Sequence, residues 1–200
     1  MPRIAIDIVL LPPPEVMRQA IAINRQLIEQ SSDGIVLDAT SCLPHLSLCM
    51  GCLEGKHLTK IGSILERLAA KQAGLELTIE SLATDETPSG QPIVYWNIVS
   101  NERLQKLHEE IMKAVMPLCT LDAKPSDVFP SGPLHEGTLQ WINGYATKSS
   151  LSKFSPHITL GFGKLPKAKL DTVFRPASLA CCHLGNYCTC RKVLASAAIR

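Results

Sequence analysis

The sequence predicts an α+β fold in which the strands pair mainly antiparallel. Segments that alternate with a period of two are interspersed, in mixed order, with segments whose apolar residues recur at helical spacing. The chain has 200 residues, of which 46% are hydrophobic and 19% charged, so it has enough apolar material for a globular core. We therefore expect one folded domain over residues 1–200.

The N-terminal part predicts a strand followed by a helix. Residues 3–11 place isoleucine or leucine at every second position, which is typical of a half-buried strand. The three prolines at 12–14 end this strand and fit the first turn of a helix. Apolar residues at helical spacing continue to about residue 30, and the polar segment 31–34 is expected to be a loop.

The middle of the chain predicts strands and helices by the same criteria. The segment 87–92, Thr-Pro-Ser-Gly-Gln-Pro, is typical of a turn, so its two flanking strands should form a hairpin. Asn101 or Ser100 should cap the helix that follows this hairpin. The predicted strands are 45–50, 75–83 and 92–100, and the predicted helices are 57–72 and about 101–115.

The C-terminal third is less regular at first. Residues 119–153 contain several prolines and glycines and show no clear period, and long segments of this kind are often functional. A lid over the site is one hypothesis for this segment. Three further strands are predicted at 156–162, 177–184 and 192–199.

Charge and hydropathy exclude two classes of protein. The formal net charge is +2, from 20 basic and 18 acidic residues, whereas a strong non-specific nucleic-acid binder usually has a marked basic excess. The apolar stretch 4–14 is interrupted by Asp7 and is too short to span a bilayer, and it lacks the features of a signal peptide. We therefore expect a cytoplasmic protein without a membrane partner.

The eight cysteines allow more than one interpretation. Because a secretion signal is absent, we expect most of them to be free and buried as small apolar side chains. Cys49-x-x-Cys52 and Cys188-x-Cys190 together could instead bind zinc, although Cys49 continues the predicted strand of His45 and the second pair lacks the usual zinc ligand spacing. A redox Cys-x-x-Cys should open a helix, which this one does not obviously do.

One motif occurs twice and carries the functional argument. Residues 44–48 read Pro-His-Leu-Ser-Leu, and residues 156–160 read Pro-His-Ile-Thr-Leu. Since successive side chains of a strand face opposite sides, His45 shares a face with Ser47, and His157 shares a face with Thr159. Each copy therefore presents an imidazole and a hydroxyl together, held by a strand whose other face is apolar.

This pairing suits the cleavage of a phosphate ester. One neutral imidazole can remove a proton from the nucleophile while one protonated imidazole gives a proton to the leaving oxygen. The two hydroxyl groups can donate hydrogen bonds to the phosphoryl oxygens. The scheme requires no metal and no cofactor.

The two motifs resemble the signature of the 2H phosphoesterase superfamily, which includes 2′-5′ RNA ligase-like proteins and 2′,3′-cyclic nucleotide phosphodiesterases. The resemblance covers most of the chain: the first strand and helix, Trp141 and Tyr145 ahead of the second motif, and residues 184–189 before the last strand. One departure is Ser47, where threonine is commoner.

The resemblance implies a bilobal, pseudo-two-fold domain with antiparallel sheets lining a central cleft and helices outside. It implies that His45 and His157 are the acid–base pair and that Ser47 and Thr159 bind phosphate. The expected partner is a nucleotide or an RNA terminus with a cyclic or 2′-linked phosphate, and no obligate protein partner is evident. Hydrolysis of a 2′,3′-cyclic phosphate is the first hypothesis. A 2′-5′ ligase or phosphodiesterase and a non-catalytic binding module remain alternatives.

Other residues carry weaker signals. Tyr95, Trp96 and Tyr187 could stack on a base, although most such aromatics are core residues. Trp141 is a further aromatic candidate, and four basic residues could supply charge to the cleft: Lys148, Lys153, Arg191 and Lys192. The remaining histidines lack the motif. We expect His57 and His108 to face solvent or cap helices and His183 to be packed on a strand, and His135 carries no specific prediction.

Overall fold

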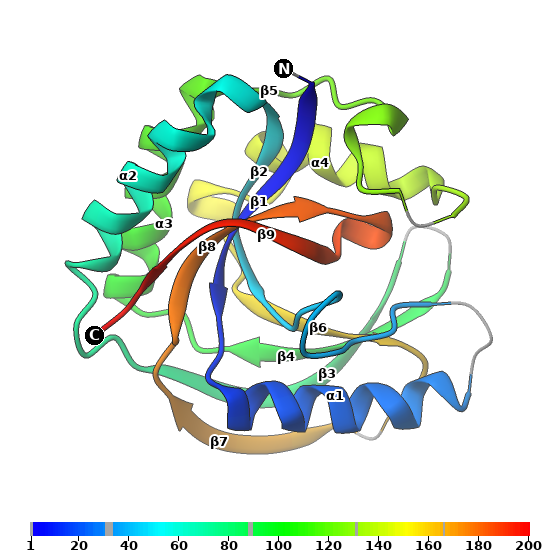
Figure 1. The fold of residues 1–200 in the computed structure, drawn as a ribbon. Coiled ribbons are helices and arrows are strands. Elements are labelled where there is room, and N and C mark those ends of the chain that lie inside the picture. Colours follow the sequence, from blue (N-terminus) through cyan, green and yellow to red (C-terminus); the bar gives the residue numbers. More distant parts are fainter. Residues whose placement is uncertain (1, 31–33, 88–89, 131, 166) are drawn as a thin grey trace.

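The computed structural model describes residues 2–30, 34–87, 90–130, 132–165 and 167–200. In this part of the chain, antiparallel strands form one large sheet, and four α-helices pack against it (Figure 1). The α+β class predicted from the sequence is confirmed. The strands are β1 Arg3–Leu11, β2 Leu46–Glu54, β3 Leu77–Glu86, β4 Pro92–Ile98, β5 Cys119–Thr120, β6 His157–Phe162, β7 Ala168–Phe174, β8 Ser178–Leu184 and β9 Cys190–Ala198.

The sheet consists of two halves that meet at β2 and β6. Its strand order is β7-β3-β4-β6-β2-β1-β8-β9, with the short β5 paired to β2 outside this path. Four strands therefore lie on each side of the junction, and the junction itself rests on one residue pair, Leu46 with Ile158. Each of these residues directly follows a motif histidine, so the two motifs begin where the halves meet.

The helices cover the two halves in a crossed arrangement. They are α1 Pro14–Ile28, α2 Leu58–Ala69, α3 Glu102–Val115 and α4 Glu136–Lys148. Helix α1 follows β1 in the chain but packs against β6 of the other half, whereas α3 follows β4 but packs against β2. Helix α2 lies on β8 and β9, and α4 crosses β2 (Figure 1).

Most predicted elements are present, with some differences. Strand β1 and the Asn101 cap agree with the sequence, because the Asn101 side chain accepts a hydrogen bond from the Leu104 amide. The segment 119–153 contains helix α4, which the sequence did not predict because Gly137 and Gly144 weaken the helical signal. Strand β7 was also missed, and β2 runs four residues beyond the predicted end at residue 50. Parts of the predicted loop 31–34 and turn 87–92 lie outside the described residues.

Asn24 on α1 is a buried polar side chain that ties three segments together. Its amide nitrogen donates to the carbonyl oxygens of Ile35 and Leu160, each at 2.7 Å, and its carbonyl oxygen accepts from the Leu37 amide at 2.8 Å. Gly161 makes room for it, because a Cβ there would lie 2.8 Å from the Asn24 amide nitrogen. Asn24 thereby fixes the segment before the first motif against the strand of the second.

His108 on α3 makes a corresponding connection, between the strand of the first motif and the segment before the second. Its Nδ1 lies 2.9 Å from the Leu48 carbonyl oxygen, and its Nε2 accepts from the Leu151 amide at 2.8 Å. The ring is fully buried and stacks on Phe154, so the prediction that His108 faces solvent or caps a helix is wrong. Leu48 and Leu160 each lie three residues after a motif histidine, so the two connections are equivalent.

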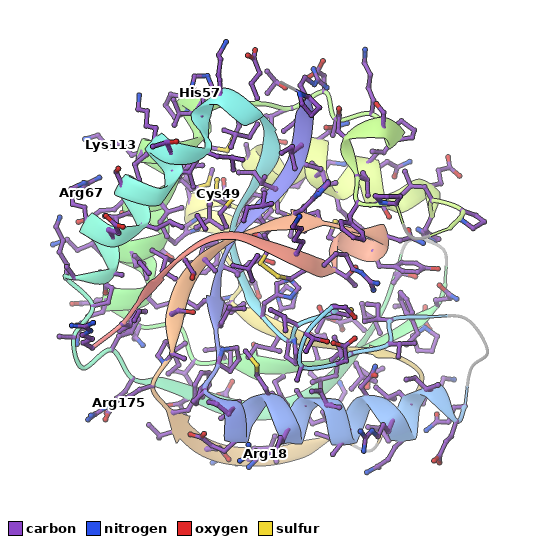
Figure 2. All side chains as sticks on the ribbon, in the orientation of Figure 1. Arg18, Cys49, His57, Arg67, Lys113 and Arg175 are labelled. Atoms are coloured by element: carbon purple, nitrogen blue, oxygen red, sulfur yellow. A yellow bond between two sulfur atoms is a disulfide. The ribbon has the colours of Figure 1, made fainter. Side chains whose placement is uncertain are left out.

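Basic side chains lie on the outer surface of the fold. Figure 2 shows Arg18, Arg67 and Lys113 on the helices and Arg175 after β7 pointing outward, whereas Cys49 lies inside the fold. Cys49 is fully buried in the core that unites the sheet with its helices. Among the described residues, no helix is both long and apolar enough to cross a membrane.

Replacing Asn24 tests its role in connecting α1 to the segment before the first motif and to the strand of the second. The Asn24→Ala variant should lose about 2–4 kcal/mol of unfolding free energy, because three hydrogen bonds disappear and their buried backbone partners are left unpaired. Urea denaturation followed by circular dichroism measures this loss. The matched control is Gln26→Ala on the exposed face of the same helix, which should change stability by less than about 0.5 kcal/mol. Equal stability of the two variants would contradict the assigned role.

Candidate active site

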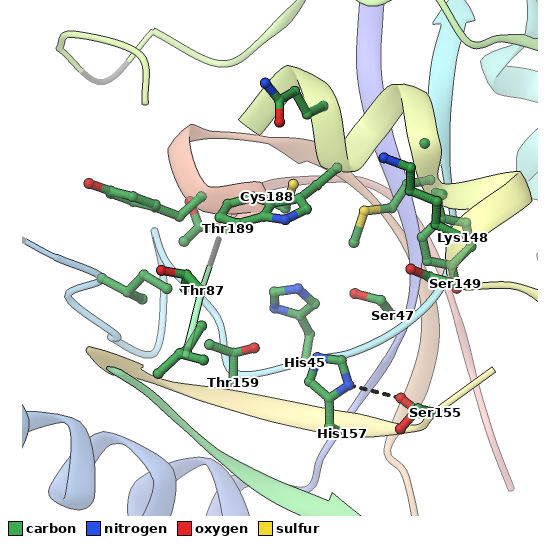
Figure 3. Close-up of a pocket in the computed structure, with 18 of the residues that line it drawn as sticks. His45, Ser47, Thr87, Lys148, Ser149, Ser155, His157, Thr159, Cys188 and Thr189 are labelled. Carbon is green, nitrogen blue, oxygen red and sulfur yellow. Dashed lines mark hydrogen bonds between the residues drawn. The ribbon is translucent and has the colours of Figure 1, made fainter. Parts of the chain in front are cut away.

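The structure brings all four predicted motif side chains into one pocket. His45, Ser47, His157 and Thr159 line a cavity of about 580 Å³ between the two halves of the sheet (Figure 3). Buried Leu46, Leu48, Ile158 and Leu160 occupy the opposite face of the same strands. In the antiparallel register set by the pair Leu46–Ile158, Ser47 is the counterpart of His157 and Thr159 is the counterpart of His45.

Both imidazoles are oriented in the same way. The Nδ1 atom of His45 lies 2.8 Å from the Leu43 carbonyl oxygen, and the Nδ1 atom of His157 lies 2.8 Å from the Ser155 carbonyl oxygen. A carbonyl oxygen can only accept, so each Nδ1 carries a hydrogen and donates it. The Nε2 atom of each ring is therefore the nitrogen that can gain or lose a proton.

The environment keeps both imidazoles largely neutral at neutral pH. Desolvation lowers the pKa of His45, the hydrogen bond to Leu43 opposes this, and the nearby charge of His157 lowers the pKa further. Desolvation also lowers the pKa of His157, opposed by the Ser155 carbonyl and by Asp85. Because the His157 side chain is exposed in the open pocket, desolvation weighs less on it than on His45. Both rings line the same pocket, so a charge on His157 disfavours a charge on His45.

The rest of the pocket has a cationic and an apolar part. Lys148 and Lys153 line it, and none of the described lining residues is acidic. Figure 3 shows Lys148 above Ser149 and Ser47 on one side of the histidines, with Thr159 and Thr87 on the other. The apolar lining residues include Ile35, Leu37, Ile93, Phe162 and Tyr187. Such a pocket suits a ligand with an anionic group at one end and a flat apolar group at the other.

Beneath the pocket lies a carboxyl group that the sequence analysis did not single out. Asp7 is fully buried on β1, where it pairs with the pocket-lining Met50, and its Oδ2 is 3.8 Å from the Nε2 of His45. Burial raises the pKa of Asp7 to about 8, although the Ser47 hydroxyl and the backbone of Cys49 and Leu48 act in the opposite direction. A charged residue within a buried apolar strand is the signal that could have identified it.

The predicted aromatic residues occupy different places. Tyr187 lines the pocket, at a backbone φ of 57° in a short 3₁₀ turn, and it contacts Phe162 edge to face. Tyr95 does not line the pocket: its ring edge packs against His157, and its hydroxyl donates to Asp85 at 2.6 Å. Trp96 is 2% exposed and belongs to the core, so its ring is not accessible to a base. Trp141 is a lining residue.

The other sequence candidates lie outside the two His-x-Ser/Thr motifs. Arg191 and Lys192 do not line the pocket, and His183 is packed on β8 against the Asp127 carbonyl oxygen, as predicted. Cys182 and Cys190 form a disulfide between β8 and β9, and the other six cysteines are free. Within the described ranges, no group of three or more His, Cys, Asp or Glu side chains is arranged to hold a metal ion. The zinc hypothesis therefore has no support.

Residues 37–183 match the family model described as the 2′-5′ RNA ligase superfamily. The match spans well over half of the sequence, and the chain belongs to this superfamily, which agrees with the resemblance to 2H phosphoesterases. No curated protein matches the chain significantly.

Solved structures share the fold. The chain resembles TT0787 of Thermus thermophilus, with a TM-score of 0.64 and 18% identity over 98% of both chains. It also resembles a protein described as a phosphoesterase, with a TM-score of 0.53 and 13% identity over 99% of both chains. A third similar structure is E. coli LigT complexed with 3′-AMP, with a TM-score of 0.51 and 16% identity over 99% of both chains. At these identities the likeness establishes the fold alone.

The buried Asp7 carboxyl should make stability depend on pH. Its pKa in the folded protein, about 8, lies above its ordinary value of 3.8, so the native state binds the proton more tightly than the unfolded state. Its contribution is therefore fully present below about pH 4 and is lost as the pH rises towards 8. Between pH 5 and 8.5, Asp7→Asn should gain on the order of a few kcal/mol relative to the wild type. Urea denaturation of both proteins across this range measures the difference, and parallel curves would contradict the raised pKa.

Proposed function

We propose that the protein is a metal-independent phosphoesterase that hydrolyses a 2′,3′-cyclic phosphate on a nucleotide or at an RNA end. The observation that carries this proposal is the shared pocket, in which two imidazoles have their Nδ1 atoms engaged by carbonyl oxygens and their Nε2 atoms available. Two such groups supply an acid and a base within one cleft. Membership of a superfamily of phosphoesterases and RNA ligases supports the same chemistry.

The proposed reaction conserves atoms and protons. One neutral imidazole takes a proton from water through its Nε2, and the water oxygen forms a new bond to phosphorus. The bond between phosphorus and one ribose oxygen then breaks, and the protonated imidazole gives its Nε2 proton to that leaving oxygen. The product is a phosphate monoester beside a free hydroxyl group, and exchange of one proton between the histidines and solvent restores the starting state.

Ser47 and Thr159 are the proposed ligands of the phosphoryl oxygens. Each hydroxyl group can donate one hydrogen bond, and the two groups approach from the two halves of the sheet. Lys148 and Lys153 at the pocket wall add positive charge, which favours an anionic substrate and its more highly charged transition state. Tyr187 and the apolar lining residues are the proposed contacts of the ribose and base. The 3′-AMP in the description of E. coli LigT supports a nucleotide as the class of ligand.

Two alternatives use the same pocket. Formation or cleavage of a 2′-5′ linkage needs the same acid and base, because the reverse reaction passes through the same transition state. A binding module without turnover would need the cationic and apolar lining residues but not both histidines. The presence of all four motif side chains favours an enzyme.

Replacing either histidine tests the proposed catalysis. His45→Ala and His157→Ala should each reduce kcat for a 2′,3′-cyclic nucleotide by at least about 1,000-fold, because each removes one proton-transfer group. The rate of product formation, monitored by chromatography, measures this loss. His57→Ala, which changes a histidine outside the pocket, is the matched control and should keep wild-type activity. Full activity in either site variant would remove that histidine from the mechanism.

Isotope labelling and chelation separate the remaining possibilities. In ¹⁸O-labelled water, hydrolysis should place one labelled oxygen on the product phosphate, whereas transfer to an RNA 5′-hydroxyl places none.

Activity should be unchanged after dialysis against a chelator, because the proposed proton transfers use side chains alone. Loss of activity that returns on adding a divalent cation would contradict metal independence.

A further inference from the structure

Asp7 is a buried titratable group beside the first motif that the proposed reaction leaves unused. Its side chain is fully buried, and neither carboxyl oxygen makes a hydrogen bond of normal length and angle to the described residues. Its Oδ2 lies 3.8 Å from the Nε2 of His45, which is an ion-pair distance rather than a hydrogen bond. A carboxyl group in this position is costly to bury unless it is neutral or has a charged partner.

The nitrogen that faces Asp7 is the one that works in catalysis. The Nδ1 atom of His45 is engaged by the Leu43 carbonyl oxygen, so Nε2 is its only site of proton exchange. Proton occupancy at this nitrogen and at Asp7 must therefore be coupled through space. If the carboxyl group is ionised, it stabilises the imidazolium, and if it is neutral, it favours the neutral ring.

The other titratable groups around Asp7 do not compete for this role. They come from the strands, the helix and the turn packed around it: Cys49 on β2, Tyr145 on α4, Cys181 on β8 and Cys188 in the turn before β9. Burial raises the pKa of each of these thiols and of the phenol, so all four are neutral at neutral pH. His45 is therefore the group near Asp7 that can carry a positive charge.

The second histidine has no equivalent partner among the described residues. The acidic residue that affects His157 is Asp85, which is exposed and hydrogen-bonded to the Tyr95 hydroxyl. Water screens an exposed carboxylate much more than a buried one. The two motifs are thus alike in backbone and in the hydrogen bond at Nδ1, but they differ in the charge beneath the ring.

We infer that Asp7 is a positioning residue that shares one proton with His45, so that His45 is the general acid and His157 the general base. This assignment rests on the proposed phosphoesterase function. An anionic phosphate in the pocket draws the shared proton onto Nε2 and leaves the carboxylate beneath it. The proton then passes to the leaving ribose oxygen, while the Nε2 of His157 takes the proton from water. The proton on His157 is finally returned through solvent to the Asp7–His45 pair.

Titration by NMR tests the shared proton without any substrate. In the wild type, the ¹³C shift of the Asp7 carboxyl and the ¹⁵N shifts of the His45 ring should change together in one step, with a second His45 step at lower pH. In Asp7→Asn the shared step should be absent while His157 titrates as before. Asp85→Asn is the matched contrast, and it should alter the His157 curve alone. Asp7→Leu is a second variant in case Asn perturbs the strand.

Two outcomes of the titration would overturn the coupling. One is an Asp7 carboxyl that ionises with an ordinary acidic midpoint and has no common step with His45. The other is a His45 curve that is the same in the wild type, Asp7→Asn and Asp7→Leu. Neither outcome depends on activity, so each is distinct from a failure of the proposed function.

The pH dependence of turnover tests the acid assignment. Asp7→Asn should lower kcat for a 2′,3′-cyclic nucleotide by about 10- to 100-fold with KM changed by less than about threefold, and it should move the alkaline limb of the kcat profile to lower pH. A purely structural role would lower the amount of folded protein and leave the profile of the remainder unchanged. An unshifted alkaline limb would overturn the assignment of His45 as the acid. A wild type without turnover would overturn the proposed function and this assignment together, and the NMR result would still decide the coupling.

Discussion

Two buried polar side chains hold the two halves of this fold in register. Asn24 connects α1 to the strand of the second motif, and His108 connects α3 to the strand of the first. A buried amide or imidazole is stable only if its hydrogen bonds are made, so each side chain accepts few positions for its partners. Both partners on the motif strands are leucine carbonyls three residues after a motif histidine. The position of each imidazole is therefore linked to the helix of the opposite half.

This crossed arrangement explains how a site can form on so small a strand junction. The halves share one strand pair, Leu46 with Ile158, which by itself gives little resistance to sliding or twisting. Asn24 also binds residues 35–37, which precede the first motif in the chain. His108 also binds Leu151, which precedes the second motif. These segments line or adjoin the pocket, so the same hydrogen bonds that join the halves also shape the cavity wall.

The sequence predicted the parts of the site that depend on local periodicity and missed those that depend on tertiary contacts. The side-chain alternation of a strand was sufficient to place His45 with Ser47 and His157 with Thr159 on common faces. Helix α4 was not predicted, because its stability comes from packing Ile142 and Tyr145 onto β2 rather than from its glycine-containing sequence. The burial of His108 could not be predicted either, since its two partners lie 60 and 43 residues away in the chain.

A nearly symmetric frame gives two nearly equivalent histidines, whereas acid–base catalysis needs two that differ. The Nδ1 contacts cannot supply the difference, because both rings donate to a carbonyl oxygen two residues earlier at the same distance. The difference must therefore come from side chains that the symmetry does not repeat. Asp7 beneath His45 and Tyr95 beside His157 are two such side chains, and one is ionisable at neutral pH while the other is not. The fold thus builds two equivalent backbone positions, and the side chains around them give the two imidazoles different surroundings.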